Sequence, residues 1–76
     1  MSDNEFDGTA VGLEQLVEAI ELERESDAEQ VSFTCTRKDA MYAIHNALLP
    51  RNEQYFLMKS ECVPYMFDLV VILKPI

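Results

Sequence analysis

The stretch that decides the fold is YMFDLVVIL, residues 65–73. It is the longest and most apolar of the segments rich in aromatic and β-branched residues, the residue types that favour strands. Successive side chains of a strand point to opposite faces of the sheet. Both faces of this stretch are apolar, with Phe67, Leu69, Val71 and Leu73 on one and Met66, Val70 and Ile72 on the other. Only Asp68 interrupts the pattern, so the sequence predicts a strand at the centre of a sheet.

Two shorter segments complete the predicted sheet. Residues 31–36 alternate with a period of two, and Val31, Phe33 and Cys35 form the apolar side. Residues 54–59 precede the central strand, and the connection 60–64 suits a hairpin loop. A helix between the first two strands would join them in parallel by a right-handed crossover, with both antiparallel to the third. We therefore expect the order 1-3-2, with strand 3 in the middle.

Two amphipathic helices are expected beside this sheet. The first covers residues 9–25, where Asp7 or Thr9 can act as the N-cap. Its apolar side chains recur at the spacing of one helix face and are Leu13, Leu16, Val17 and Ile20. The second begins at Thr36, which forms a capping box variant with Asp39, and ends before Pro50. Its apolar face comprises Ala40, Met41, Ile44, Ala47 and Leu48.

The length of 76 residues leaves room for one domain only. We predict an α+β domain over residues 9–76, with the order α-β-α-β-β, a three-stranded antiparallel sheet and both helices on one face. Residues 1–8 are expected to be a flexible acidic N-terminal lead. The sheet face opposite the helices would then expose Val70 and Ile72, so we expect a homodimer or a hetero-complex to cover it.

The charge is concentrated in the first helix and its surroundings. The net charge is −8, and residues 1–29 hold ten acidic residues against one basic residue, Arg24. Four glutamates share one face of the predicted helix, and we call this set the acidic ridge: Glu14, Glu18, Glu21 and Glu25. The ridge has two interpretations, a solvated face that keeps the protein soluble or a docking surface for a basic partner. The charge disfavours direct contact with nucleic acid.

The residue types of catalysis and metal binding are present without a recognisable arrangement. Arg37 and Lys38 could hold an anion at the start of the second helix, although no glycine-rich loop accompanies them. His45 has no positioned nucleophile or acid in the sequence. Cys35 and Cys62 lack the spacing of a metal motif or a disulfide scaffold, which favours a reducing compartment. We expect no cofactor, no metal and no catalytic residue.

The sequence also bears on location. Its N-terminus lacks the pattern of a signal peptide, and the longest apolar run, residues 69–73, is too short to cross a bilayer. We therefore expect a cytoplasmic protein without membrane contact.

Three functions are compatible with these patterns. The first is a small non-enzymatic protein that binds a larger basic protein or nucleoprotein complex and inhibits or modulates it, as small phage-encoded inhibitors do. The acidic ridge, Tyr65 and Phe67 would contact this partner. The second is a structural or regulatory module that forms a homodimer through the sheet face and has no basic partner. The third is an enzyme or small-ligand domain that uses Arg37, Lys38 and His45.

Overall fold

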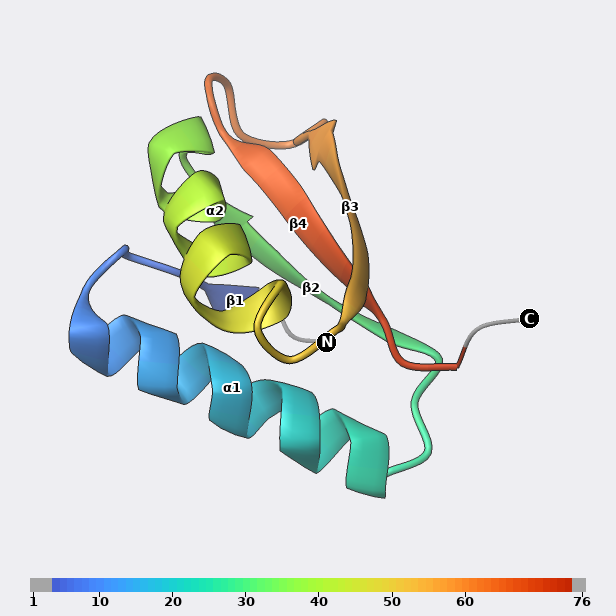
Figure 1. Ribbon diagram of the computed structural model, residues 1–76. Coiled ribbons are helices and arrows are strands. Elements are labelled where there is room, and N and C mark those ends of the chain that lie inside the picture. Colours follow the sequence, from blue (N-terminus) through green and yellow to red (C-terminus); the bar gives the residue numbers. More distant parts are fainter. Residues whose placement is uncertain (1–3, 75–76) are drawn as a thin grey trace.

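The central strand lies where the sequence places it, although it begins at Phe67, two residues later than predicted, because Tyr65 belongs to the preceding turn. The computed structural model describes residues 4–74, and in it β4 (Phe67–Ile72) has β2 (Gln30–Cys35) on one side and β3 (Gln54–Lys59) on the other (Figure 1). Both neighbours run antiparallel to β4 along its full length. This arrangement confirms the order 1-3-2 of the three predicted strands and the α+β class.

The N-terminal segment is more structured than the sequence analysis expected. Within the predicted flexible lead, β1 (Asn4–Glu5) pairs in parallel with β2 and adds a fourth strand at that edge. The amide of Phe6 continues the ladder by donating to the carbonyl of Thr34 at 3.1 Å. The Phe6 side chain is 4% exposed and stacks on Tyr42 with ring centroids 6.3 Å apart. Burial of this aromatic ring offsets the entropy of ordering a short strand. Residues 1–3 and 75–76 of the predicted segments lie outside the described residues.

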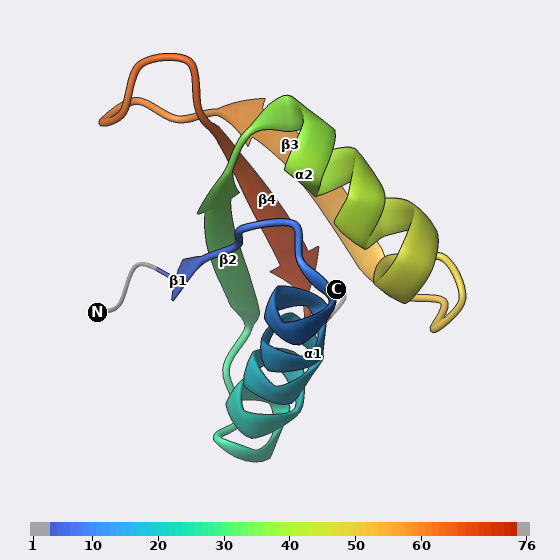
Figure 2. The same ribbon diagram turned by 90° about the vertical axis from the view of Figure 1, so that its left-hand side faces the viewer.

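Both helices cover the same face of the sheet, as predicted (Figure 2). Helix α1 (Ala10–Glu25) packs mainly over β2, and α2 (Arg37–Ala43) packs mainly over β4. The π-helix η1 (Ile44–Leu48) continues α2. The strand register places Phe33 opposite Leu69 and Tyr55 opposite Val71 on the helix-covered face. The alternation predicted for β2 and β4 is therefore correct.

The core lies between this face and the helices. Its fully buried large side chains are Ile20, Leu48, Leu69, Val71 and Cys35. Met41 departs from the prediction, because it is exposed although its spacing places it near the apolar stripe of the second helix. The residues that the core buries follow regular helical spacing and are Ala40, Ala43, Ile44, Ala47 and Leu48, and at 100° per residue Met41 lies at the margin of this stripe.

The start of α1 is held by two side chains. The hydroxyl of Thr9 accepts from the amide of Gly12 at 2.9 Å, and the Asp7 carboxylate accepts from the amide and the hydroxyl of Thr9. The bond from the Thr9 hydroxyl is the main cause of a lowered pKa at Asp7. Just before the cap, Gly8 has a φ of 73°, and a Cβ there would overlap the Asp39 carboxylate at the start of α2. Glycine at this position therefore lets the chain pass close to α2.

The second helix begins as predicted and ends in a different form. Thr36 is its N-cap and accepts from the amide of Asp39 at 3.1 Å. In the second half the amide of Leu49 donates to the carbonyl of Ile44, five residues earlier, at 2.9 Å. The Asn46 side chain donates to the Tyr42 carbonyl, an acceptor that an α-helix would use for its own backbone bond. The Asn46 amide thus competes for a backbone acceptor in the segment where the helix widens.

The buried thiol of Cys35 gives the fold a measurable response to alkaline pH. Burial raises the pKa of Cys35 from an ordinary 9.0 to about 11. The folded state keeps the thiol neutral while the unfolded chain ionises it, so this contribution to stability is complete below pH 9 and disappears as the pH rises to 11.

We expect the free energy of unfolding to fall by about 2 kcal/mol more in the native chain than in a Cys35→Ala variant over this interval. Urea unfolding of both proteins at several pH values measures the difference. Parallel curves would show that this thiol ionises equally in the folded and unfolded states.

Candidate functional site

A groove of about 370 Å³ lies between α1 and the end of the second helix. Its apolar floor consists of Leu13, Val17 and Ala47. Leu13 and Val17 belong to the predicted core stripe of α1 but are only partly buried, whereas Leu16 and Ile20 on the same stripe are fully covered. The core thus covers only part of the apolar stripe of α1. The uncovered part, Leu13 and Val17, forms the floor of the groove.

Acidic side chains border this floor. Glu14, Glu18 and Glu21 line the groove from α1, and Asn46 and Arg51 line it from the other side. Glu14 and Glu18 are exposed and make no ion pair within residues 4–74. Three members of the acidic ridge therefore adjoin one apolar hollow, while Glu25 is exposed at the end of the helix.

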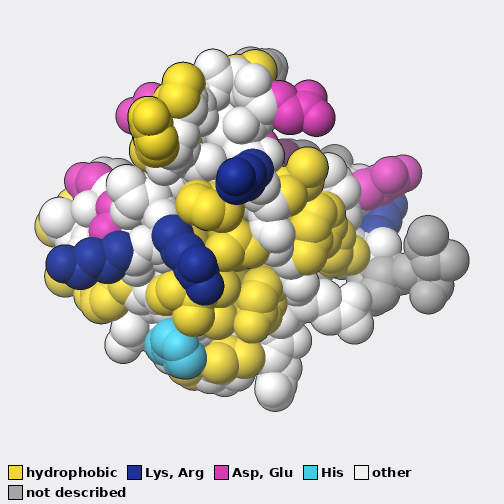
Figure 3. Space-filling view, turned by 90° about the horizontal axis from the view of Figure 1, so that it is seen from above, with side chains coloured by type: hydrophobic (Ala, Val, Ile, Leu, Met, Phe, Trp, Pro, Cys, Tyr) yellow, Lys and Arg dark blue, Asp and Glu magenta, His cyan; other side chains and the backbone are white. Residues whose placement is uncertain are grey.

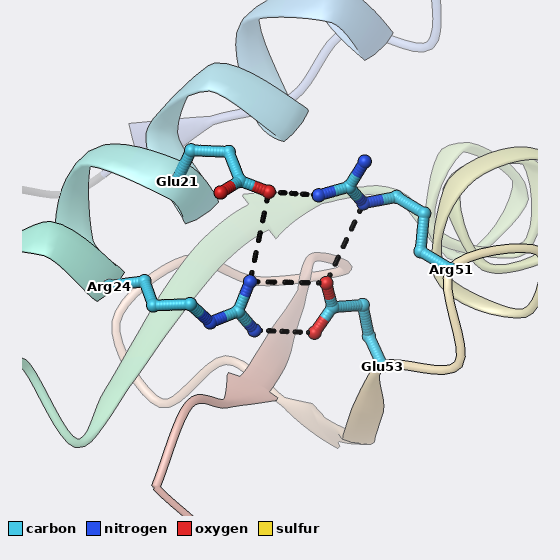
Figure 4. A network of polar contacts seen from close by, with 4 residues as sticks. All are labelled: Glu21, Arg24, Arg51 and Glu53. Carbon is cyan, nitrogen blue, oxygen red and sulfur yellow. Dashed lines mark hydrogen bonds and ion pairs between the residues drawn. The ribbon is translucent and has the colours of Figure 1, made fainter.

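Glu21 has an internal role as well. It pairs with Arg51, which follows the second helix, and lies 3.7 Å from Arg24 one turn further along α1. Arg24 binds Glu53 with N–O distances of 2.7 and 3.5 Å, and Arg51 approaches Glu53 at 3.5 Å. These four side chains alternate in charge around a closed ring (Figure 4). We call this set the ion-pair ring.

The ion-pair ring connects α1 to the turn that leads into β3. The Glu53 side chain is 8% exposed, so its carboxylate is almost withdrawn from water and takes its partners from the two arginines. The hydrogen bond to Glu53 is the main cause of the raised pKa of Arg24. A nearly buried carboxylate that lost these partners would be strongly unfavourable. The ring thus fixes one end of the groove, and Glu21 is less available to a partner than Glu14 or Glu18.

The other predicted contact residues, Tyr65 and Phe67, lie away from the groove. They belong to the β3–β4 connection and the start of β4, at the top of the molecule in Figure 1, whereas α1 lies along its lower edge. Both line a second hollow of about 450 Å³, together with Lys59, Ser60, Pro64 and Met66. The structure therefore divides the predicted contact residues into two separate groups.

The β3–β4 connection presents Tyr65 to solvent in a strained conformation. Residues 63–66 form a turn in which the amide of Met66 donates to the carbonyl of Val63 at 3.3 Å. Pro64 occupies the second position and Tyr65 the third, where its φ is 66°. This is the pattern of a type II turn, which normally has glycine or asparagine at that place. Tyr65 is 95% exposed, so no packing in the described structure explains the choice of tyrosine.

The same end of the molecule carries basic residues without ion pairs. Arg37 and Lys38 begin α2, and Lys59 ends β3; none of them forms an ion pair in the described part of the chain. Viewed from above, hydrophobic side chains occupy the middle of this surface, with basic side chains among them and the histidine at the margin (Figure 3). The charge of the protein is therefore uneven, with the acidic ridge on a different part of the surface.

The remaining candidates stay apart. His45 is exposed on η1 and lines neither of the two hollows, and Cys62 is exposed in the β3–β4 connection. Across residues 4–74, no three His, Cys, Asp or Glu side chains lie close enough together to hold a metal ion. Arg37, Lys38 and His45 thus line neither of the two hollows described above.

Sequence reasoning missed the groove and the ion-pair ring. Arg51 and Glu53 lie about 30 positions from their partners on α1, and no local periodicity joins such distant residues. The one available signal was the width of the α1 stripe, because Leu13 and Val17 extend it beyond the two residues that the core buries.

Comparisons with family models, curated proteins and solved structures give no match to this chain. None of the helices in the described range has the length and apolar character that crossing a bilayer requires. The site is therefore interpreted from its own geometry.

The strained turn allows a test of whether Tyr65 serves contact with a partner and not the stability of the fold. Tyr65→Asn should raise the free energy of unfolding by roughly 0.5–1 kcal/mol, because asparagine tolerates positive φ better than tyrosine. Val63→Asn, an exposed change in the same turn without positive φ, should leave it nearly unchanged. Chemical unfolding of the three proteins measures both effects. A loss of stability in Tyr65→Asn would show that the ring contributes to the fold.

Proposed function

We propose that this protein is a small non-enzymatic binding protein whose groove accepts a basic segment of a larger protein or nucleoprotein complex, which it thereby inhibits or modulates. The observation that carries the proposal is the pairing of an apolar floor, Leu13 and Val17, with the unpaired carboxylates of Glu14 and Glu18 at its rim. A segment with an apolar side chain between lysine or arginine residues matches both parts.

Electrostatics support a basic occupant. The net charge of −8 attracts a positive surface at long range and speeds association at low ionic strength. At short range, Glu14 and Glu18 are free to form new ion pairs, whereas Glu21 already has two arginine partners. The same charge repels a phosphate backbone, so the partner we propose is a protein surface and not nucleic acid itself.

Nothing in this function requires a catalytic group or a cofactor. We place the interaction in the cytoplasm, because Cys35 and Cys62 are free thiols and a reducing compartment keeps them so. Tyr65 belongs to the proposal as a second contact, at the other end of the molecule, for a partner large enough to reach it.

Charge reversal on the rim tests the proposal. Glu14→Lys/Glu18→Lys should slow association with the partner about tenfold at low salt, because the steering field and the rim contacts are removed. Glu5→Lys/Glu29→Lys is the matched control, since it also raises the net charge by four and changes exposed side chains that line neither hollow. Capture from a host lysate identifies the partner, and association rates are then measured with the purified partner and all three proteins.

We expect the control variant to bind the partner faster than the rim variant does. Both variants should unfold near the melting temperature of the native protein. Equal rates for the two variants would mean that only total charge matters and that the groove is not the docking site. Unchanged binding in both variants would leave the acidic ridge as a solvated face.

A second candidate function, the self-associating module, has an observation of its own. The sheet face opposite the helices exposes Phe56 (45%) and Met58 (42%) on β3. The patch is smaller than the sequence predicted, because Val70 is only 4% exposed between its neighbours Ser32 and Phe56. The half of the face over β2 is polar, with Thr34 donating to Asp68 at 3.3 Å.

Ile72→Lys tests this candidate, because Ile72 is half-buried on the open face. A lysine there would place a charge in the interface and weaken packing against a second sheet. If the face is the dimer interface, the variant should sediment as a monomer where the native chain is dimeric, and added salt should change the native dimer little. An unchanged dimer in Ile72→Lys would exclude the face as the interface.

A further inference from the structure

Strand β3 forms an unpaired edge of the sheet over the described residues. Its only neighbour is β4, and Figure 1 shows no described element beyond it on the other side. Just after β3, the amide of Ser60 donates to the carbonyl of Met66, which precedes β4. The backbone groups of Ser60 therefore point toward β4. Since that direction alternates along an antiparallel pair, the N–H and C=O groups of Tyr55, Leu57 and Lys59 point outward.

The side chains of this edge are unusually apolar. Tyr55, Phe56, Leu57 and Met58 are four consecutive large hydrophobic residues, and none of them is buried. Phe56 and Met58 face the open side, while Tyr55 and Leu57 are half-buried at the margin of the core. Natural edge strands are usually protected by proline, a bulge, short length or several charges. β3 has only Lys59, at its end.

We infer that β3 pairs with β3 of a second copy of this chain, antiparallel and about a two-fold axis at Leu57, so that two sheets join into one. This register places Leu57 opposite Leu57 of the second copy and Tyr55 opposite Lys59. Each outward N–H and C=O of these three residues then meets a partner, because residues opposite each other at such positions exchange both bonds. A register that places Leu57 opposite Phe56 or Met58 is excluded, since residues opposite each other must have their side chains on the same face of the sheet.

The side chains of β3 favour a second copy as the occupant. In the antiparallel pair, Phe56 of each copy packs against Met58 of the other, an aromatic–sulfur contact. Lys59 has no ion pair within residues 4–74 and stands opposite Tyr55 of the other copy, so its charge meets an aromatic ring and not another charge. The two strands therefore match each other along the proposed register.

The arrangement is independent of the proposed function. The rim residues Glu14 and Glu18 lie on α1, which packs mainly over β2, and they are not among the β3 residues that would pair, so the rim of the groove remains free in the dimer. The edge dimer therefore goes beyond partner binding, and the rim variant Glu14→Lys/Glu18→Lys should dimerise as the native chain does. Failure of the groove hypothesis and failure of the edge dimer are thus separately visible.

Proline at position 59 tests the backbone pairing. The N–H of Lys59 points outward, so Lys59→Pro removes an intermolecular donor without removing a bond to β4. Lys59→Ala is the matched control, because it loses the same charge and keeps the N–H. By analytical ultracentrifugation at high micromolar concentration, we expect a native dimer and a dissociation constant at least about tenfold weaker for Lys59→Pro than for Lys59→Ala. A monomeric native chain, or equal constants for the two variants, would overturn the inference.

Disulfide cross-linking tests the register in a Cys62→Ser background. Opposite residues at the axis have Cα atoms about 5.5 Å apart, within the range of a disulfide. Under mild oxidation Leu57→Cys should form a covalent dimer, whereas Phe56→Cys, which faces itself only in a register shifted by one residue per strand, should not. Preferential cross-linking of Phe56→Cys, or of neither variant, would overturn the proposed axis. Circular dichroism checks that each variant keeps the native fold.

Discussion

The hydrogen-bonding of β4 along both of its edges is the constraint on which the rest of the molecule depends. Its six residues pair throughout with β2 and with β3. An apolar strand with partners on both sides must also be covered on at least one face, and α1 and α2 supply that cover. Because β4 occupies the middle, β3 becomes an edge, and the hairpin that joins the two strands carries Tyr65 to one end of the molecule.

Helix α1 depends on a few well-defined attachments. Leu16 and Ile20 enter the core, Thr9 and Asp7 hold the first turn, and the ion-pair ring holds the last turns against Glu53. A domain of this size buries a modest core, so such attachments matter to its stability. Between these attachments Leu13 and Val17 remain partly uncovered and form the floor of the groove.

Periodicity in the sequence was sufficient to predict β2, β4 and both helix starts, with the side of the sheet that the residues of these two strands face, whereas β3 was predicted from its residue types and the hairpin connection. It could not predict β1, because two residues carry no pattern and the stability of β1 comes from Phe6 packing on Tyr42. The π-helix was not predicted, because no periodicity in the sequence marks the change to the bond from Leu49 to the carbonyl of Ile44, five residues earlier. The acidic ridge was visible, but the removal of Glu21 into the ring with Arg51 depends on residues brought together only by folding.

The two cysteines differ in exposure, so thiol labelling can follow two different parts of the structure. Cys62 is exposed in the β3–β4 connection, whereas Cys35 is fully buried and its pKa is raised. A thiol reagent should therefore label one site in the folded chain, so a dye placed there observes the end of the molecule that carries Tyr65. The second site reacts only when β2 separates from its neighbours, so its labelling rate follows the opening equilibrium of the central sheet in water without denaturant.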